Sequence, residues 1–381
     1  MLLFAYWRHI TGFTLGLSTM LGVPAVCPAQ EKSLEQSSTQ ATSLNNNQSP
    51  RDFDLSAEET VGFELQFPAM GTLVQLKTFA TSKAEVEAGF SAAQRRVQEI
   101  AKTLTDYDSD SETRQLSQSA VDSPQQVSAD LWAVLNASDE WYQKTEGRFD
   151  SSLGSLTRLW RKYRRARRIP EADLVHSALQ DSGWNHVQLD ANGHTIQFSK
   201  AGIALDFGGI GKGYIVDEAF GVLLEHGLPQ SLVNISGNMR LGTAPPNRDG
   251  WKIEVAPVEA SGKPIQRLAL SECSIATSGD LWQFIEIDGV RRSHILDPKT
   301  GFGVPGPISA TVITKHAIDA DALATAACIL PTEQAIELCE QQKASCLVAQ
   351  RQGGKLRIAR SAAFPSPLEP NSKESSPGSR N

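Results

Sequence analysis

Residues 203–220 read IALDFGGIGKGYIVDEAF, and the interpretation of the whole chain depends on this stretch. The apolar residues 203–207 predict a strand, and apolar side chains then recur at helical spacing. The residues that share the apolar face of this helix are Ile215, Ala219, Val222 and Leu223. Between strand and helix lie Gly208, Gly209, Gly211 and Gly213. Because backbone N–H groups at a helix N-terminus attract anions, the stretch predicts a loop that can hold a phosphate.

The spacing of these glycines matches neither of the common nucleotide-binding motifs. The stretch contains no G-x-G-x-x-G and no G-x-x-x-x-G-K-[ST]. Lys212 nevertheless lies where its side chain can reach a phosphate, and Asp206 ends the predicted strand with its carboxylate facing the same loop. The alternative is a tight strand-to-helix turn that needs glycine only for positive φ angles. The stretch alone leaves both interpretations open.

The composition is that of a globular protein with an acidic charge balance. The chain has 381 residues, of which 40% are hydrophobic and 21% charged, and its formal net charge is -7. Non-specific nucleic-acid binding needs a basic field, so this charge argues against a nucleic-acid partner. The cysteines beyond residue 29 are Cys273, Cys328, Cys339 and Cys346. None form a C-x-x-C pair, and we expect buried thiols rather than a disulfide framework.

The N-terminal residues predict export. Residues 1–29 combine Arg8 with an apolar run from residue 10 to residue 26, a pattern typical of a secretory signal peptide. The run is short and interrupted by glycine and proline, which argues against a membrane span. We therefore expect an exported, periplasmic protein. Two anchors would hold it at the membrane: a lipid on Cys27, or an uncleaved N-terminal segment.

Composition also sets the domain limits. Residues 30–60 are rich in Ser, Gln, Asn and Thr and contain few apolar side chains, so we expect a disordered tether. The composition of residues 364–381 predicts a disordered tail. Residues 61–363 contain no further linker and no internal repeat. We interpret them as one domain.

Two helices and several strands can be predicted from periodicity in this domain. Apolar side chains alternate along a strand from Thr72, and a helical stripe of them runs from Val86 to Leu104. A second helix is expected at 129–142, with Ser128 as its N-cap. Further strands are predicted at 232–236, 251–256, 267–271 and from residue 308.

Hairpins and a late helix decide the fold class. Two hairpins are predicted, with turns at Asp288-Gly289 and at Gly353-Gly354. A helix is expected from Asp319, which is a candidate N-cap. Hairpins combined with long helices predict an α+β fold, with antiparallel sheets and packed helices, rather than a doubly wound parallel sheet.

Eight short segments, in order from residue 67 to residue 327, resemble one known family. They are FPAMGT (67–72), LTDYDSDSETRQLS (104–117), EGRFDSSLGSLTRLW (146–160), LDFGGIGKGYIVDEA (205–219), LVNISGNMRLG (232–242), IATSGD (275–280), HILDPKTG (294–301) and DADALATAA (319–327). Each is weak alone, but their order leaves little room for chance. The chain resembles the ApbE family, the FAD:protein FMN transferases.

This resemblance implies a fold related to the T-fold and a Mg²⁺-dependent reaction. FMN would pass from FAD to a Ser or Thr hydroxyl of an acceptor protein, and AMP would leave. The resemblance also suggests that the acceptors are flavin-carrying subunits of membrane redox complexes. By the same resemblance, the residues that contact FAD are Met70, Tyr107, Asp150, Asp206 and Lys212. The alternatives are core packing for Met70 and Tyr107, and a turn role for Asp150.

A metal site is expected on the late helix. Asp321 and Thr325 lie four residues apart, so they share one helical face. A carboxylate and a hydroxyl are hard oxygen ligands of the kind that Mg²⁺ prefers. The family resemblance adds the backbone carbonyl of Gly209 as a third ligand. The alternative for Asp321 and Thr325 is helix capping or a hydrogen bond to a neighbouring turn.

The proton acceptor is expected in HILDPKTG. Phosphoryl transfer to a hydroxyl needs a group that accepts or steers the proton, and histidine titrates in the useful range. We predict His294 as this base, with Asp297 supporting the site and Asp206 as the competing base. Thr277 and Ser278 are expected to line the substrate channel. Ser278 does not lie in a G-x-S-x-G elbow, which argues against a serine hydrolase.

Three features depart from the family pattern or stand outside it. Ser236 occupies a position where the family commonly has glycine, and Ser152 one where threonine is more usual. The basic run RKYRRARR (161–168) is expected to be a solvated loop, with a docking site for an acidic partner or anionic lipid as the alternative.

Two other functions are compatible with the sequence. Water in place of the acceptor hydroxyl would make the protein an FAD pyrophosphatase that releases FMN and AMP. A flavin-binding lipoprotein without turnover is the non-catalytic alternative. A pure carrier needs neither a metal pair nor a base, so Asp321, Thr325 and His294 argue against it.

Overall fold

The structure is a computed structural model that describes residues 60–287 and 289–368. Its sheets are formed by β1 (Val61–Ala69), β2 (Thr72–Ala80), β3 (Gln125–Gln126), β4 (Val187–Asp190), β5 (Thr195–Phe198), β6 (Ser231–Ile235), β7 (Asn238–Leu241), β8 (Trp251–Val255), β9 (Gln266–Leu270), β10 (Cys273–Gly279), β11 (Phe284–Ile287), β12 (Val290–Leu296), β13 (Gly303–Pro305), β14 (Ile308–Thr314), β15 (Ser345–Gln352) and β16 (Lys355–Arg360). The helices are α1 (Lys83–Leu104), α2 (Glu112–Ser119), α3 (Ala129–Lys144), α4 (Gly154–Arg165), α5 (Ala172–Gln180), α6 (Gly211–Glu225), α7 (Ala317–Ile329) and α8 (Thr332–Gln341), with a 3-10 turn at Trp184–His186.

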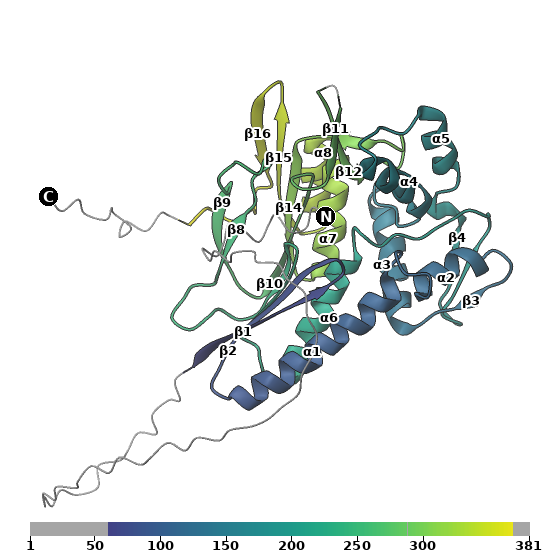
Figure 1. Ribbon diagram of the computed structural model, residues 1–381. Coiled ribbons are helices and arrows are strands. Elements are labelled where there is room, and N and C mark those ends of the chain that lie inside the picture. Colours follow the sequence, from purple (N-terminus) through teal and green to yellow (C-terminus); the bar gives the residue numbers. More distant parts are fainter. Residues whose placement is uncertain (1–59, 288, 369–381) are drawn as a thin grey trace, which may run out of the picture. The chain divides into compact units, whose positions relative to one another are not determined.

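Eight of these strands form one antiparallel sheet in the order β1-β2-β6-β7-β10-β14-β15-β16. Helices α1, α6 and α7 pack together beside it, and α7 lies against β10 and β14 (Figure 1). Three smaller sheets are β11-β12-β13, β3-β5-β4 and β8-β9. The predicted α+β class with antiparallel sheets and packed helices is confirmed. None of the described helices is long and apolar enough to cross a membrane.

The periodic predictions are confirmed in detail. Along β2 the buried side chains are Val74, Leu76 and Thr78. Along α1 the apolar stripe from Val86 to Leu104 faces the core. Helix α3 begins where its predicted cap requires, because the Ser128 hydroxyl accepts a hydrogen bond from Leu131 N. Both hairpins form, although Asp288 itself lies outside the described residues.

Helix α7 lies at the centre of the main core. Nine of its 13 residues are buried, and six of these nine are alanines. Small side chains let α6, β10 and β14 approach it closely, so the apolar surface on every side of α7 is removed from water. Cys328, Cys339 and Cys346 are buried free thiols and Cys273 is a half-buried one, so the described cysteines form no disulfide.

Three expectations about local structure are wrong. Residues 203–207 form no regular strand, because only Ala204 pairs, in an isolated parallel bridge with Leu153. Asp319 is not an N-cap: α7 begins at Ala317, and the Asp319 carboxylate accepts from Trp141 Nε1 at 3.1 Å. The tail does not begin at Phe364, which is only 7% exposed and packs in a core cluster with β8 and β9.

Residues 365–368 also belong to the folded part. Gln266 donates to the Pro365 carbonyl at 3.2 Å, and Leu368 N donates to the Arg267 carbonyl at 2.7 Å. The remainder of the predicted tail, the signal peptide at 1–29 and the tether up to residue 59 lie outside the described residues. Lipidation of Cys27 therefore stays a prediction.

The closeness of α6 and α7 gives a direct stability test. A Cβ at Gly213 would lie 2.3 Å from the Ala317 carbonyl oxygen, whereas a Cβ at Gly221, in the same helix, would meet nothing within 4 Å. We expect Gly213→Ala to lower the free energy of unfolding by about 3 kcal/mol or more, because backbone must move. Gly221→Ala should leave stability unchanged or raise it by up to about 1 kcal/mol. Urea unfolding of the full chain measures both, and equal stability of the two variants would contradict this packing.

Candidate functional site

The glycine-rich loop is built for close approach and not for positive φ. None of Gly208, Gly209, Gly211 and Gly213 has a positive φ, so the simple-turn alternative is wrong. A Cβ at Gly209 would lie 3.0 Å from Thr325 Oγ1 on α7. Asp206 Oδ1 accepts from Gly208 N at 2.8 Å, and the Gly208 carbonyl accepts from Lys212 Nζ at 2.6 Å. The Lys212 side chain therefore folds back over the loop, and Gly209 lies close to Thr325 of α7.

The predicted metal ligands meet at this contact. Asp321 is 2% exposed, and its Oδ2 accepts from Gly213 N at 3.0 Å and lies 3.7 Å from Lys212 Nζ. One carboxylate oxygen of Asp321 thus makes the hydrogen bond to a neighbouring turn that was the alternative to metal binding. Thr325 Oγ1 lies 3.2 Å from Ser278 Oγ, at the end of β10. Burial raises the pKa of Asp321, and the Lys212 ammonium opposes this rise.

One buried atom supports a cation at this place. The Asn238 side chain faces Asp321, yet its Oδ1 is buried without a hydrogen-bond partner among the described residues. A buried carboxylate, a hydroxyl and an orphaned amide oxygen are hard ligands that suit Mg²⁺. The described residues contain no cluster of three or more His, Cys, Asp or Glu side chains that could hold a metal. A metal here would therefore need hydroxyl, carbonyl or substrate oxygens beside Asp321.

His294 is held in a defined tautomer on β12. Its Nδ1 lies 3.0 Å from the Gln283 carbonyl oxygen. Since a carbonyl only accepts hydrogen bonds, Nδ1 carries the proton and Nε2 keeps its lone pair. Burial is the main cause that lowers the pKa of His294 to about 4, and the charges of Arg164 and Lys212 lower it further. The ring is therefore neutral at pH 7 and can accept a proton.

Asp280 fixes the hairpin that carries His294, and the sequence prediction missed it. Asp280 is fully buried, and its carboxylate accepts from Ile308 N at 2.9 Å and from Arg291 Nε at 2.7 Å. Arg291 also donates to the Asp280 carbonyl at 2.6 Å. Asp280 thus ties β12 to β10 and β14. The quoted segment IATSGD contained this residue, but no spacing indicated that its partner was Arg291.

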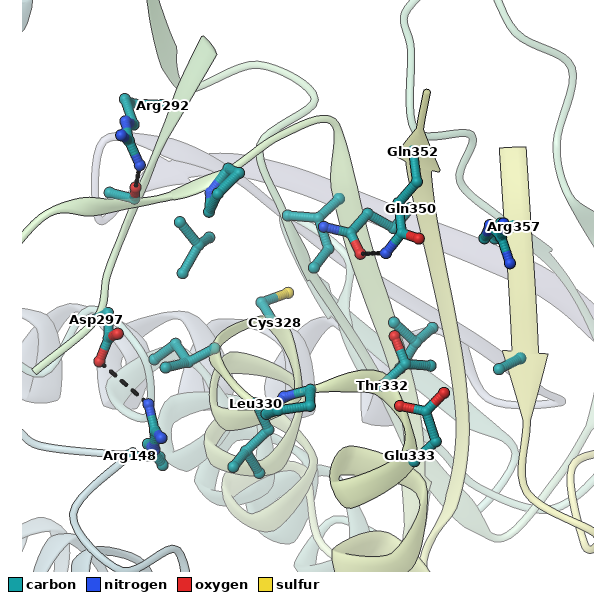
Figure 2. Close-up of a pocket in the computed structure, with 18 of the residues that line it drawn as sticks. Arg148, Arg292, Asp297, Cys328, Leu330, Thr332, Glu333, Gln350, Gln352 and Arg357 are labelled. Carbon is teal, nitrogen blue, oxygen red and sulfur yellow. Dashed lines mark hydrogen bonds and ion pairs between the residues drawn. The ribbon is translucent and has the colours of Figure 1, made fainter. Parts of the chain in front are cut away.

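Asp297 organises the turn after β12. Its Oδ1 accepts from Lys299 N at 2.9 Å and lies 3.4 Å from Arg148. No hydrogen bond joins Asp297 to His294 among the described residues. Asp297 instead faces a cavity of about 840 Å³ between β13, β15, β16 and the end of α7 (Figure 2). Its supporting role at the site stays a prediction.

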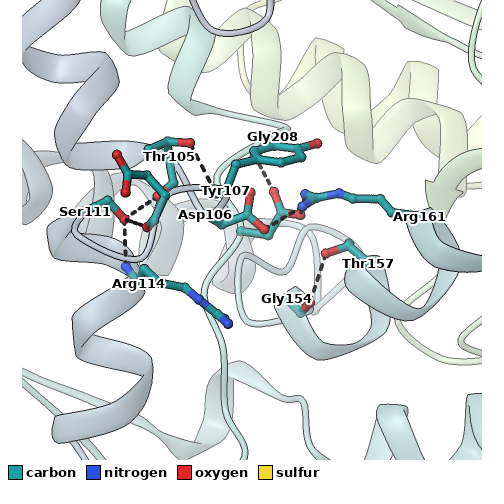
Figure 3. A network of polar contacts seen from close by, with 11 residues as sticks. Thr105, Asp106, Tyr107, Ser111, Arg114, Gly154, Thr157, Arg161 and Gly208 are labelled. Atoms are coloured by element: carbon teal, nitrogen blue, oxygen red, sulfur yellow. Dashed lines mark hydrogen bonds and ion pairs between the residues drawn. The ribbon is translucent and has the colours of Figure 1, made fainter. Parts of the chain in front are cut away.

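A polar network lies beside the predicted flavin residue Tyr107 (Figure 3), and it includes Asp206, the second predicted flavin residue. Arg161 donates to Asp106 Oδ2 and to Asp206 Oδ2, each at 2.5 Å. The Arg161 guanidinium also stacks on the Tyr107 ring at 4.4 Å from its centroid. Tyr107 is 71% exposed, so core packing is wrong for this residue and its ring is open to a ligand. Burial and the nearby Asp206 raise the pKa of Asp106.

Three of the predicted substrate contacts also have structural partners. Asp150 accepts from Ser152 N at 2.7 Å and from Trp184 N at 3.3 Å, which confirms the turn role. Met70 packs partly buried against the main core, at φ 52, in the turn between β1 and β2. Thr277 Oγ1 lies 2.8 Å from Thr311 Oγ1. Direct contacts of these side chains with flavin stay predictions.

The two departures from the family pattern are accommodated. Ser236 has φ 52 in the turn between β6 and β7, a conformation that glycine adopts more readily. Ser152 is fully buried, donates to Asp150 Oδ1 at 2.5 Å and accepts from Gly183 N at 2.9 Å. A serine hydroxyl is therefore sufficient at position 152.

The basic run is not a solvated loop throughout. Residues 161–165 form the end of α4, and Arg161 is half-buried between two carboxylates. Arg164 is half-buried, while Lys162 and Arg165 are exposed. The residues on the inner face, at 158, 161 and 164, are spaced by three. This i, i+3 spacing was the signal available in the sequence.

Comparison with known proteins agrees with this architecture. The model of the ApbE family matches residues 70–348. The chain is 31% identical over 288 residues to a Treponema pallidum protein named FAD:protein FMN transferase, covering 71% of this chain and 80% of the relative. A Vibrio cholerae protein of the same name is 28% identical over 291 residues, covering 74% of this chain and 86% of the relative.

Solved structures give the same result. A mutant of the flavin transferase ApbE from Vibrio cholerae superimposes with a TM-score of 0.72 at 26% identity, covering 79% of this chain and 98% of that chain. The ApbE protein of Thermotoga maritima gives 0.72 at 27% identity, covering 79% and 97%. Fold and relatives define this chain as an enzyme of the transferase class. It belongs to the ApbE family.

The state of His294 can be measured directly. We expect its ring protons to titrate in the full chain with a midpoint about pH 4 in NMR spectra, because burial and two cations disfavour the imidazolium. The folded-state pKa lies below the ordinary 6.5, so the neutral ring stabilises the fold above that value. This contribution is lost as the pH falls toward 4. A midpoint near 6.5 would contradict the described environment.

Proposed function

We propose that this protein is an FAD:protein FMN transferase that attaches FMN to a Ser or Thr hydroxyl of an acceptor protein. One observation carries the proposal: the glycine-rich loop brings the Lys212 ammonium to 3.7 Å from the buried Asp321 carboxylate and brings Gly209 against Thr325. A cation and a buried carboxylate that suits a metal therefore lie together, and the charge of Lys212 also acts on His294. The names of the curated relatives support the same reaction.

His294 accepts the proton of the acceptor hydroxyl in this proposal. Its Nδ1–H is fixed by the Gln283 carbonyl, so Nε2 is the atom that can take the proton. The rigid Asp280–Arg291 pair holds the strand in place. Asp206, the competing base, already accepts from Gly208 and pairs with Arg161, so its lone pairs are engaged. The geometry therefore favours His294 over Asp206.

Gly209, Asp321 and Thr325 would hold Mg²⁺, with the Gly209 carbonyl and the Thr325 hydroxyl as the other two protein ligands. Bound Mg²⁺ would neutralise charge on the pyrophosphate oxygens of FAD. Lys212 contributes a second positive charge from the same loop. Both charges stabilise a transition state in which negative charge builds up on the phosphoryl oxygens.

The proposed transfer forms one bond to phosphorus and breaks another. The acceptor hydroxyl oxygen forms a bond to the FMN phosphorus of FAD as its proton passes to His294 Nε2. The bond between this phosphorus and the bridging oxygen breaks, and AMP leaves with the bridging oxygen. FMN remains attached to the acceptor through a phosphoester. No oxidation or reduction takes place.

The remaining predicted residues would form the walls of the FAD site. Tyr107 offers an exposed ring face for stacking on a flat ring, and Met70 offers a polarisable one. Asp150 and Asp206 shape the two turns beside the site. Ser278 contacts Thr325 and would line the channel toward the metal site. Thr277, the preceding residue of β10, pairs with Thr311 and is proposed to line the same channel.

We also propose that the protein acts outside the cytoplasm, in the periplasm. The motivation is the signal-like sequence of residues 1–29, with Cys27 as a lipidation site or the N-terminal segment as an anchor. Acceptors would then be exported proteins, of which subunits of membrane redox complexes are the class suggested by family resemblance.

The transfer itself can be tested with Asp321→Asn. The asparagine oxygen can still accept from Gly213 N, so the fold should survive while the metal charge is lost. We expect FMN attachment to a Thr-containing acceptor peptide to fall by about 100-fold or more. Mass spectrometry measures the mass added by FMN on the peptide, with FAD and Mg²⁺ supplied.

Asp319→Asn is the matched control on the same helix. It keeps the acceptor for Trp141 Nε1 and lies outside the site, so its activity should equal that of the wild type. Free FMN and AMP with no modified peptide in a panel of acceptors would support the pyrophosphatase. FAD bound but unchanged would support the carrier, and equal activity of Asp321→Asn would exclude the metal role.

His294→Asn tests the base separately from binding. The asparagine amide can replace Nδ1–H against the Gln283 carbonyl but removes Nε2. We expect kcat for transfer to fall by about 10² to 10⁴, with FAD affinity retained. His176→Gln, at an exposed position on α5, is the control and should be fully active. If kcat is unchanged in His294→Asn, His294 is not the base, and Asp206 becomes the candidate.

A further inference from the structure

Three arginines line one face of α4. Arg158, Arg161 and Arg164 are spaced by three residues, so their side chains leave neighbouring turns on the same side of the helix. Lys162 and Arg165 are exposed, whereas Arg158, Arg161 and Arg164 are at least half-buried. We name these last three the arginine row.

Helix α4 is fixed against the hairpin that carries His294. Trp160 donates from Nε1 to the Gly301 carbonyl at 2.8 Å and packs edge-on against Phe302, with ring centroids 5.9 Å apart. Leu156 shares a buried cluster with Ile285 of β11 and Leu296 of β12. Arg164 follows Trp160 by four residues, so it projects from this same anchored face toward β12.

Arg161 is the fully paired member of the row. Both arms of its guanidinium are bound by buried carboxylates, and its flat face covers one side of Tyr107. Asp206 in turn accepts a hydrogen bond from Gly208 N, so it links Arg161 to the glycine-rich loop. Arg161 therefore fixes the positions of α4, the Tyr107 ring and the glycine-rich loop relative to one another (Figure 3).

The other two members carry charge that nothing in the described part of the chain neutralises by contact. Arg158 Nε and Nη2 are buried without a hydrogen-bond partner among residues 60–287 and 289–368. Arg164 is half-buried and forms no hydrogen bond or ion pair within the same ranges. The row supplies three positive charges to the two carboxylates of Asp106 and Asp206. An excess of positive charge therefore faces the site.

Part of this charge acts on the predicted base. The charged groups that act on His294 are Arg164 from α4, Lys212 from α6 and Asp280, which follows β10, and the two cations oppose its protonation. Asp280 is already bound to Arg291. Arg164 lies one helical turn beyond Arg161, whose guanidinium binds Asp206 beside the glycine-rich loop that carries Lys212. Two cations from different helices therefore lie beside the same loop, where an anionic group would be stabilised.

We propose that Arg164 contacts the phosphoryl group of FAD that is transferred, as a cation that acts independently of the metal, and that Arg161 is its positioning residue. This inference rests on the proposed transferase function. Arginine presents several N–H donors in a flat fork that matches phosphate oxygens. With Lys212 on one side and Arg164 on the other, the charge on the phosphoryl oxygens would be stabilised before and during the displacement.

The test compares Arg164→Gln with Arg165→Gln in the full chain. Arg165 is the adjacent, exposed arginine of α4, so its substitution removes the same charge from a position in solvent. We expect Arg164→Gln to weaken FAD binding by about 10-fold, measured by flavin fluorescence in EDTA, and to lower kcat by about 10- to 100-fold. Arg164→Lys should restore part of both, and Arg165→Gln should match the wild type.

An NMR titration separates this role from a merely structural one. Removing Arg164 removes a cation that opposes protonation of His294, so the pKa of His294 should rise above about 4 in Arg164→Gln and stay there in Arg165→Gln. Thermal unfolding confirms that both variants are folded. If the wild type transfers FMN and Arg164→Gln has the same FAD affinity and kcat, the inference is wrong. Arg164-dependent FAD binding without transfer by the wild type would instead reject the proposed function and keep this contact.

Discussion

The site depends on a reciprocal contact between α6 and α7. Asp217 on α6 accepts from Ala317 N and Ile318 N, each at 2.9 Å, and Asp321 on α7 accepts from Gly213 N at 3.0 Å. Each helix thus caps free N–H groups in the first turn of the other, where no intrahelical partner exists. The contact requires glycine at 213, because any Cβ there would strike the Ala317 carbonyl. Docking of the helices brings the glycine-rich loop against Thr325.

The charges around this contact explain the state of the base. Lys212 and Arg164 act together with burial to keep His294 neutral. A bound phosphate would offset both cations, and the pKa of His294 would then rise toward the range in which histidine is an effective base. The free protein would hold a weak base, and the substrate itself would strengthen it. Substrate binding and proton acceptance would in this way be linked through the same two cations.

Much of the fold follows from local patterns in the sequence. Alternation along β2, the apolar stripe of α1 and the Ser128 cap are each satisfied by residues close in the chain. Errors arose where a distant partner decides the outcome. The apolar residues Ile203, Ala204, Leu205 and Phe207 are buried in the core but do not form a regular strand. Asp319 resembles a cap but bonds to Trp141, and Phe364 closes a core formed by β8 and β9.

The sequence by itself determined the residue types of the site and their order. Asp321 and Thr325 share a helical face by spacing alone, and the eight family segments placed Lys212 and His294 among them. Only the tertiary structure decided which charges meet. The pairing of Asp280 with Arg291 and the pairing of Arg161 with Asp106 and Asp206 both join residues from separate elements. The physical reason is that the energies of charges depend on burial and on neighbours in space, which periodicity along the chain does not encode.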